Sequence, residues 1–193
     1  MKTLTLLFTF LISFPLALSA QSAEDVLQKV SVAMTAEQWE QAVSLFRQAI
    51  QLNADKSEMF YWTSVDKASS VGTKMAQELV FHYKTMRNYD KAYLFCKEVL
   101  QKNPNDVKWL AACAETEVCR GKEKDALLTY QKVLSLDVNH LAANIFVGNY
   151  YYLMAEQEKQ QLMRDYKKIS SPTRMQYALS LIHISEPTRR TPI

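Results

Sequence analysis

One stretch of the chain recurs after a fixed interval. The segment Tyr89–Leu100, YDKAYLFCKEVL, aligns without a gap with Glu123–Leu134, EKDALLTYQKVL, so that Ala92 and Ala126 lie 34 residues apart. A period of this length is typical of a solenoid, in which one helical hairpin is copied and stacked on the next. Such an architecture presents a binding surface, but the repeat itself does not identify a partner.

The N-terminus has the parts of a secretory signal peptide. Lys2 precedes a nearly uninterrupted apolar run from Leu4 to Leu18, and Ser19 and Ala20 are small residues at its exit. We expect a signal peptide over residues 1–20, removed by cleavage after Ala20. An uncleaved anchor is the alternative, but the run is short for a membrane span. The mature protein is therefore predicted to be exported, periplasmic or associated with the cell envelope, with no membrane span after cleavage.

The C-terminus resembles a translated sequencing adapter. Residues 179–189, LSLIHISEPTR, match the translation of a transposase adapter used in library preparation. We therefore expect residues 179–193 to be adapter read-through and the natural protein to continue past Ala178. A natural tail rich in Pro, Thr and Arg is the alternative.

Charge gives no sign of a nucleic-acid partner. The whole chain has a formal net charge of +3. Without Lys2, Glu186, Arg189 and Arg190 it falls to about +1, with both signs mixed along the chain. Glycine and proline are scarce between the two ends, which predicts helices joined by short turns.

Small and aromatic residues recur at set places around the 34-residue period. The units begin near Ala23 and at Thr73, Val107 and Leu141. Ala42, Ala92, Ala126 and Gly148 are predicted where two helices cross, because a larger side chain would separate the axes. Phe46, Tyr83, Tyr130 and Tyr151 fill the adjoining space, while Pro104 ends one helix and Gly121 suits a left-handed residue after another.

This pattern resembles that of the tetratricopeptide repeat family, whose units are 34-residue helical hairpins. The resemblance covers most of residues 23–158 and implies an all-α, right-handed superhelical solenoid. We expect hairpin 1 over 21–55, an interrupting helix or spacer over 56–72, repeats over 73–106 and 107–140, and hairpin 4 with the start of a truncated helix over 141–178.

The interruption holds four consecutive large apolar residues. From Ala42 to Ala92 is 50 residues, 16 more than one period, and the surplus contains Met59, Phe60, Tyr61 and Trp62. These side chains pack against a neighbouring repeat or form a platform for a ligand, and aromatic residues dominate protein cores.

The resemblance also implies a concave groove lined by the first helix of each repeat. The residues carried over to that groove are Lys74, Gln77, Phe81, Lys84, Lys108, Glu115, Val118, Ile145, Asn149 and Tyr152. Apolar anchors among lysines suit an extended or helical peptide of some acidic character. The alternative is that Phe81, Ile145 and Leu153 complete the core. The lysine and asparagine clamp with which some members of the family hold a C-terminal carboxylate is not assembled.

Nothing in the sequence predicts catalysis, a metal or a cofactor. His82 falls beside packing positions, His140 begins a helix, and Glu115 and Glu117 point to opposite sides of one helix, so no acid–base pair forms. No group of His, Cys, Asp and Glu has metal-ligand spacing. The cysteines Cys96, Cys113 and Cys119 are an odd number, and Cys96 with Cys113 is either a disulfide or a pair of buried thiols.

We therefore predict a non-catalytic scaffold or adaptor that binds a partner peptide or a subunit of an envelope complex. The alternative is the N-terminal repeat module of a longer protein whose catalytic or membrane domain lies outside this sequence.

Overall fold

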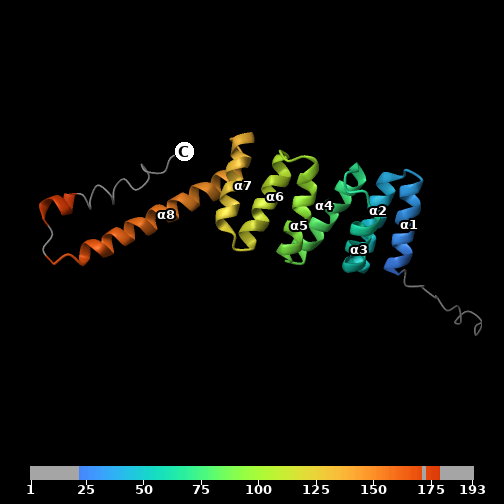
Figure 1. Cartoon of the computed structure of the whole chain (residues 1–193), viewed down its shortest axis with the longest axis horizontal. Helices are drawn as coiled ribbons and strands as arrows, with labels where there is room; N and C mark the ends of the chain where they lie inside the picture. Colours follow the sequence, from blue (N-terminus) through green and yellow to red (C-terminus); the bar gives the residue numbers. More distant parts are fainter. Residues whose placement is uncertain (1–21, 171–172, 179–193) are drawn as a thin grey trace, which may run out of the picture. The chain divides into compact units, whose positions relative to one another are not determined.

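The computed structural model describes residues 22–170 and 173–178, and these residues form helices without a β-strand (Figure 1). The predicted signal peptide, 1–20, and the suspected adapter segment, 179–193, lie outside the described residues. The chain divides into two compact units with a boundary between Val65 and Asp66. The all-α repeat fold predicted from the sequence is confirmed.

The first unit contains three helices. They are α1 (Ala23–Thr35), α2 (Trp39–Leu52) and α3 (Ala54–Ser64), and α1 pairs with α2 as a hairpin. Asn53 ends α2 and caps α3, because its side-chain oxygen accepts from the Lys56 amide at 2.9 Å. An additional helix thus occupies part of the predicted interruption, although it begins at Ala54 rather than after Lys56.

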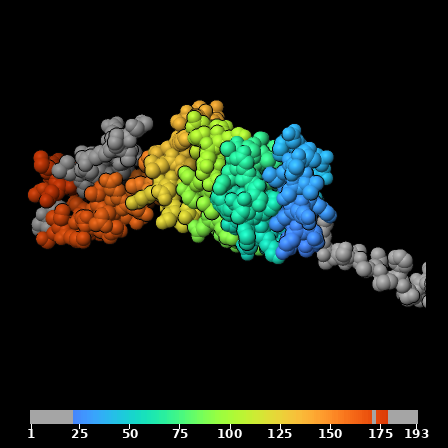
Figure 2. All heavy atoms as spheres, turned by 45° about the vertical axis from the view of Figure 1, so that its right-hand side comes forward, coloured from blue at the N-terminus to red at the C-terminus, as the bar shows by residue number. Residues whose placement is uncertain are grey.

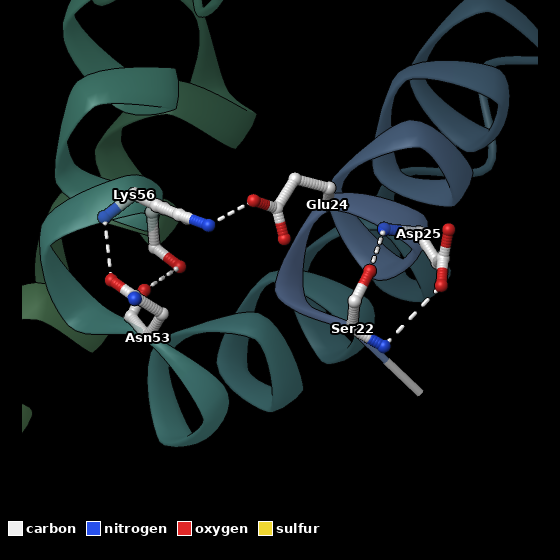
Figure 3. A network of polar contacts seen from close by, with 6 residues as sticks. Ser22, Glu24, Asp25, Asn53 and Lys56 are labelled. Carbon is white, nitrogen blue, oxygen red and sulfur yellow. Dashed lines mark hydrogen bonds and ion pairs between the residues drawn. The ribbon is translucent and has the colours of Figure 1, made fainter. Parts of the chain in front are cut away.

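A polar network joins the beginnings of α1 and α3. Ser22 and Asp25 form a reciprocal capping box at the start of α1, with bonds of 3.2 and 3.3 Å (Figure 3). The ammonium of Lys56 contacts the Glu24 carboxylate, and this hydrogen bond lowers the pKa of Glu24 below its usual value. Both partners are exposed, so the pair contributes little to stability.

The aromatic run in α3 is partly buried. Tyr61 is 1% exposed, whereas Met59 is 63% exposed. The Phe60 ring lies 6.2 Å from the ring of Phe46 in α2. These contacts favour packing over a ligand platform.

The second unit is a stack of hairpins. Its helices are α4 (Ser70–Thr85), α5 (Tyr89–Lys102), α6 (Val107–Cys119), α7 (Glu123–Leu136) and α8 (Leu141–Lys167). Each packs against the next in sequence, as the green-to-yellow part of Figure 1 shows. Between α5 and α6, Pro104 lies in an exposed turn and Asp106 caps α6 by accepting from the Trp109 amide at 3.2 Å.

The predicted packing residues of the hairpins are buried. Ala42, Ala92 and Ala126 are fully inaccessible, as is Phe46. Tyr83 and Tyr130 are 4% and 6% exposed, and each ring contacts an aromatic ring on the neighbouring helix. Small residues therefore sit where paired helices approach closely, with large rings beside them.

The three turns inside hairpins have one conformation. Glu37, Arg87 and Gly121 adopt the left-handed region with φ of 56°, 56° and 72°. In each turn the amide of the next residue donates to the carbonyl five residues before it, at 2.8–2.9 Å. The donor and acceptor pairs are Gln38 and Ala33, Asn88 and Tyr83, and Lys122 and Glu117. This is the Schellman arrangement, which satisfies the carbonyls at a helix end.

The last helix differs from the predicted hairpin. α8 runs without a turn from Leu141 to Lys167, where the period requires a break after about 13 residues. Its middle, MAEQEKQ, contains strong helix formers and no glycine, proline or asparagine, so the helix continues. The second half of α8, orange in Figures 1 and 2, projects past α7.

This continuity changes the surroundings of two predicted packing residues. Gly148 is exposed, and a Cβ added there would meet nothing within 4 Å. Tyr151 is half-buried, and its hydroxyl accepts from the Gln131 amide nitrogen at 2.9 Å. Gly148 therefore does not lie at the predicted crossing, because α8 continues without a turn through the place where the second helix of its hairpin would begin. None of the described helices combines the length and apolar character that crossing a membrane requires.

Replacing Gly121 or Gly148 by alanine should change the free energy of unfolding in opposite directions, although a Cβ meets no atom within 4 Å at either residue. Gly121→Ala should lower the free energy of unfolding by about 1–2 kcal/mol, because an alanine is strained at positive φ. Gly148→Ala should raise it, by up to about 1 kcal/mol, because alanine favours a helix interior. Urea unfolding followed by circular dichroism measures both. Destabilisation by Gly148→Ala would instead place a packing contact at that residue.

Candidate functional site

The candidate groove residues of α4 and α6 lie on one face of the second unit. The Phe81 ring of α4 is 5.7 Å from the Trp109 ring of α6. The Lys84 ammonium on α4 is 2.6 Å from the Glu115 carboxylate on α6. These contacts bring the first helices of two consecutive repeats together at the level of their side chains, as a shared groove requires.

Phe81 is the apolar centre of this face. Its side chain is 50% exposed, whereas Trp109 is 5% exposed and forms a buried base beside it. Gln77 and Val118 are half-buried, and Lys74 is as well. Phe81 therefore does not complete the core, and it offers a partner an aromatic surface held in place by another ring.

The charge of the face is more balanced than expected. Lys84 is neutralised by Glu115, and only 27% of the Lys84 side chain is exposed. Lys108 is exposed and its ammonium lies 5.7 Å from the centre of the Trp109 ring, within range of a cation–π contact. A lysine-lined groove was predicted, but one of its lysines is already used inside the protein.

The candidate residues of α8 belong to a separate hollow. Ile145 and Asn149 line a space of about 350 Å³ with Phe146, Tyr150 and Leu153 of α8 and Glu123 of α7. Ile145 is 54% exposed and Leu153 58%, so neither completes the core. Tyr152 is 68% exposed and is not among the lining residues. Among the described residues, no hydrogen bond, ion pair or ring contact joins these side chains to Phe81 or Glu115.

One acidic side chain of α6 is buried, and the sequence analysis did not assign it to a site. Glu117 occupies the repeat position of Tyr83 and Tyr151 but is 4% exposed, and its Oε2 has no hydrogen-bond partner in the described residues. Burial first, and then the Glu117 charge, raise the pKa of the Tyr93 phenol. As predicted, Glu115 and Glu117 face opposite ways, since Glu115 is exposed.

The two histidines among the described residues are His82 and His140. His82 is half-buried, and burial followed by the charge of Lys91 lowers its pKa. His140 caps α8, because its Nδ1 accepts from the Ala143 amide at 3.3 Å. Within residues 22–170 and 173–178, no three His, Cys, Asp or Glu side chains are placed to hold a metal ion.

The three cysteines are free thiols with different surroundings. Cys96 on α5 and Cys113 on α6 are buried, whereas Cys119 is exposed. Burial raises the pKa of Cys96 and of Cys113 to about 12. Thiols in apolar surroundings stay protonated and react slowly, whereas an exposed thiol reacts with alkylating reagents.

A neutral maleimide should therefore label one thiol in the folded chain. We expect rapid modification at Cys119 alone, and modification of all three cysteines after unfolding in urea. Cys96 and Cys113 should stay protected from about pH 7 to 9, well below their raised pKa. Intact mass and peptide mapping measure the sites. If the unfolded chain without reductant were labelled at Cys119 only, and at all three cysteines once reductant was added, Cys96 and Cys113 would be joined by a disulfide.

The chain is strongly similar to a protein whose structure has been solved. This protein comes from Bacteroides ovatus ATCC 8483 and is described as a candidate protein-binding protein. Its sequence is 61% identical to this chain, and its crystal structure superimposes with a TM-score of 0.78. The match covers 86% of this chain and 81% of the other.

Weaker similarities involve helical-repeat proteins. A mutant of MamA is 18% identical, with a TM-score of 0.44 and coverage of 71% of this chain and 90% of that one. The C-terminal tetratricopeptide-containing domain of a Plasmodium falciparum FK506-binding protein is 19% identical, with a TM-score of 0.43 and coverage of 72% and 92%. Both scores are too low to carry an inference. No protein-family model and no curated protein matches the chain.

Proposed function

Because the chain belongs to the same family as the Bacteroides ovatus protein, we propose that it is a non-catalytic scaffold that binds another protein. The partner is a peptide segment or a subunit of a cell-envelope complex. The face around Phe81 on α4 and α6 receives it. The description of the Bacteroides ovatus protein as a candidate protein-binding protein supports this class of function.

The observation that carries the proposal is the exposure of Phe81. Half of this aromatic ring is open to solvent while its other side contacts Trp109. An exposed ring on a rigid helix suits an interface anchor, because little conformational entropy is lost when it is covered. The Lys84–Glu115 pair beside it presents both signs of charge to the rim of such an interface.

Location in the envelope is part of the proposal. It rests on the signal peptide predicted over residues 1–20, whose parts are a positive charge, an apolar run and small residues at its exit. An exported scaffold would find its partners among periplasmic or envelope proteins.

A second candidate function is the N-terminal module of a longer protein. It is favoured by α8, where Ala143 is the only buried one of 27 residues and several large apolar side chains are exposed, including Tyr152, Leu153 and Met154. Stacked repeats normally end in a polar cap. The sequence of the gene and its downstream region distinguishes the two candidates: an end after one capping helix supports the scaffold, and a further domain supports the module.

Partner capture tests the role of Phe81. The full chain is immobilised and exposed to envelope extract, and bound proteins are quantified by mass spectrometry. Phe81→Ala should reduce recovery of a specific partner by about fivefold or more, since truncating an anchor costs over about 1 kcal/mol.

Leu128→Ala is the matched control. Leu128 is an apolar side chain of α7 with 66% exposure, and it lies outside the candidate face. Recovery should be unchanged for this variant, and circular dichroism should show that both variants are folded. Equal recovery from Phe81→Ala and the unchanged chain would refute the proposed face.

A further inference from the structure

A hollow of about 450 Å³ lies between two successive turns of the second unit. It is bordered by the α4–α5 turn with the start of α5, and by the α6–α7 turn. Its polar lining includes Arg87, Asn88, Asp90, Cys119, Arg120 and Lys122. The volume is within the range of ligand sites in proteins, about 300–1,000 Å³. None of these residues belongs to the candidate face of α4 and α6 around Phe81.

Positive charge predominates in this hollow. Three of the lining side chains are cationic, Arg87, Arg120 and Lys122, and Asp90 is the single acid among them. Arg87 and Lys122 form no ion pair with any residue that the structure describes. The buried Glu117, which is not in the lining, reduces the positive excess without cancelling it.

Arg120 is held in a fixed position. Its Nε donates to Asp90 Oδ1 at 2.7 Å, and its guanidinium carbon lies 4.4 Å from the centre of the Tyr93 ring. The other guanidinium nitrogens have no hydrogen bond within the described chain. A planar guanidinium fixed on one edge and open on another suits bidentate binding of a carboxylate.

We propose that this hollow, here called the turn pocket, binds a carboxylate-bearing segment of a partner protein. Arg120 holds a carboxylate of the segment by its open edge, while Arg87 and Lys122 attract neighbouring acidic residues. The proposal rests on the proposed protein-binding function and adds a second contact surface to it. An acidic segment held at the turns and an apolar side chain held at Phe81 would contact separate surfaces of the second unit.

Cys119 provides a direct readout, because it is an exposed thiol in the wall of the turn pocket. The rate at which a neutral maleimide labels Cys119 is measured in the full chain, with and without a hexapeptide of glutamates. The peptide should slow labelling, and added salt should reverse the effect by screening the charges. A hexapeptide of glutamines should have no effect.

The double variant Arg87→Gln/Lys122→Gln removes two charges without touching the Arg120–Asp90 pair. It should bind the glutamate peptide about tenfold more weakly or worse, since charge-assisted contacts are lost. Lys102→Gln is the control, because Lys102 is an exposed lysine at the end of α5 and outside the pocket. This control should bind as the unchanged chain does.

Three results would overturn the proposal. They are no protection by the glutamate peptide, equal protection in the double variant, and equal protection by inorganic phosphate alone, which would indicate a site for small anions. Phe81→Ala should leave peptide protection intact. Failure of the face around Phe81 is therefore distinguishable from failure of the turn pocket.

Discussion

The close approach of paired helices at an alanine is the contact on which the rest of the structure depends. Ala42, Ala92 and Ala126 are fully buried at the same place in three hairpins. A larger side chain there would push the helix axes beyond the usual 8–10 Å or so and lift the flanking rings out of contact. The left-handed turn residues Arg87 and Gly121 then set the direction in which each second helix returns.

Repetition of this hairpin produces both proposed binding surfaces. Copies of one helix carry Phe81 and Trp109 to the same face, where the Lys84–Glu115 pair joins them. Copies of one turn carry Arg87 and Arg120 to the border of the turn pocket. Neither surface requires a special loop, because each is made of residues that recur with the repeat.

The sequence predicted the features set by the repeat period and by local backbone preference, and it missed the contacts between residues on different helices. The buried alanines and the left-handed Gly121 follow from period and backbone preference, and the structure shows both. The Lys84–Glu115 pair links residues 31 apart, and its formation depends on the separation of α4 and α6, which one sequence does not give. The hairpin turn expected inside residues 141–167 is absent, because the period competes there with strong local helix preference, whereas the helix does end at Lys167 and another begins at residue 174. The turn pocket also depends on the placement of two turns, although the clustering of Arg120 and Lys122 in one turn was a visible signal.

Two fragments of the second unit decide whether the hairpins depend on one another. Residues 69–103 contain α4 and α5 with their caps, and residues 69–137 add α6 and α7. Short helices are marginal in water, and a lone hairpin leaves one apolar side uncovered. Circular dichroism with urea should show the single hairpin largely unfolded and the pair more helical per residue, with a cooperative transition. A single hairpin with the same helicity and the same urea midpoint as the pair would contradict mutual stabilisation by stacking.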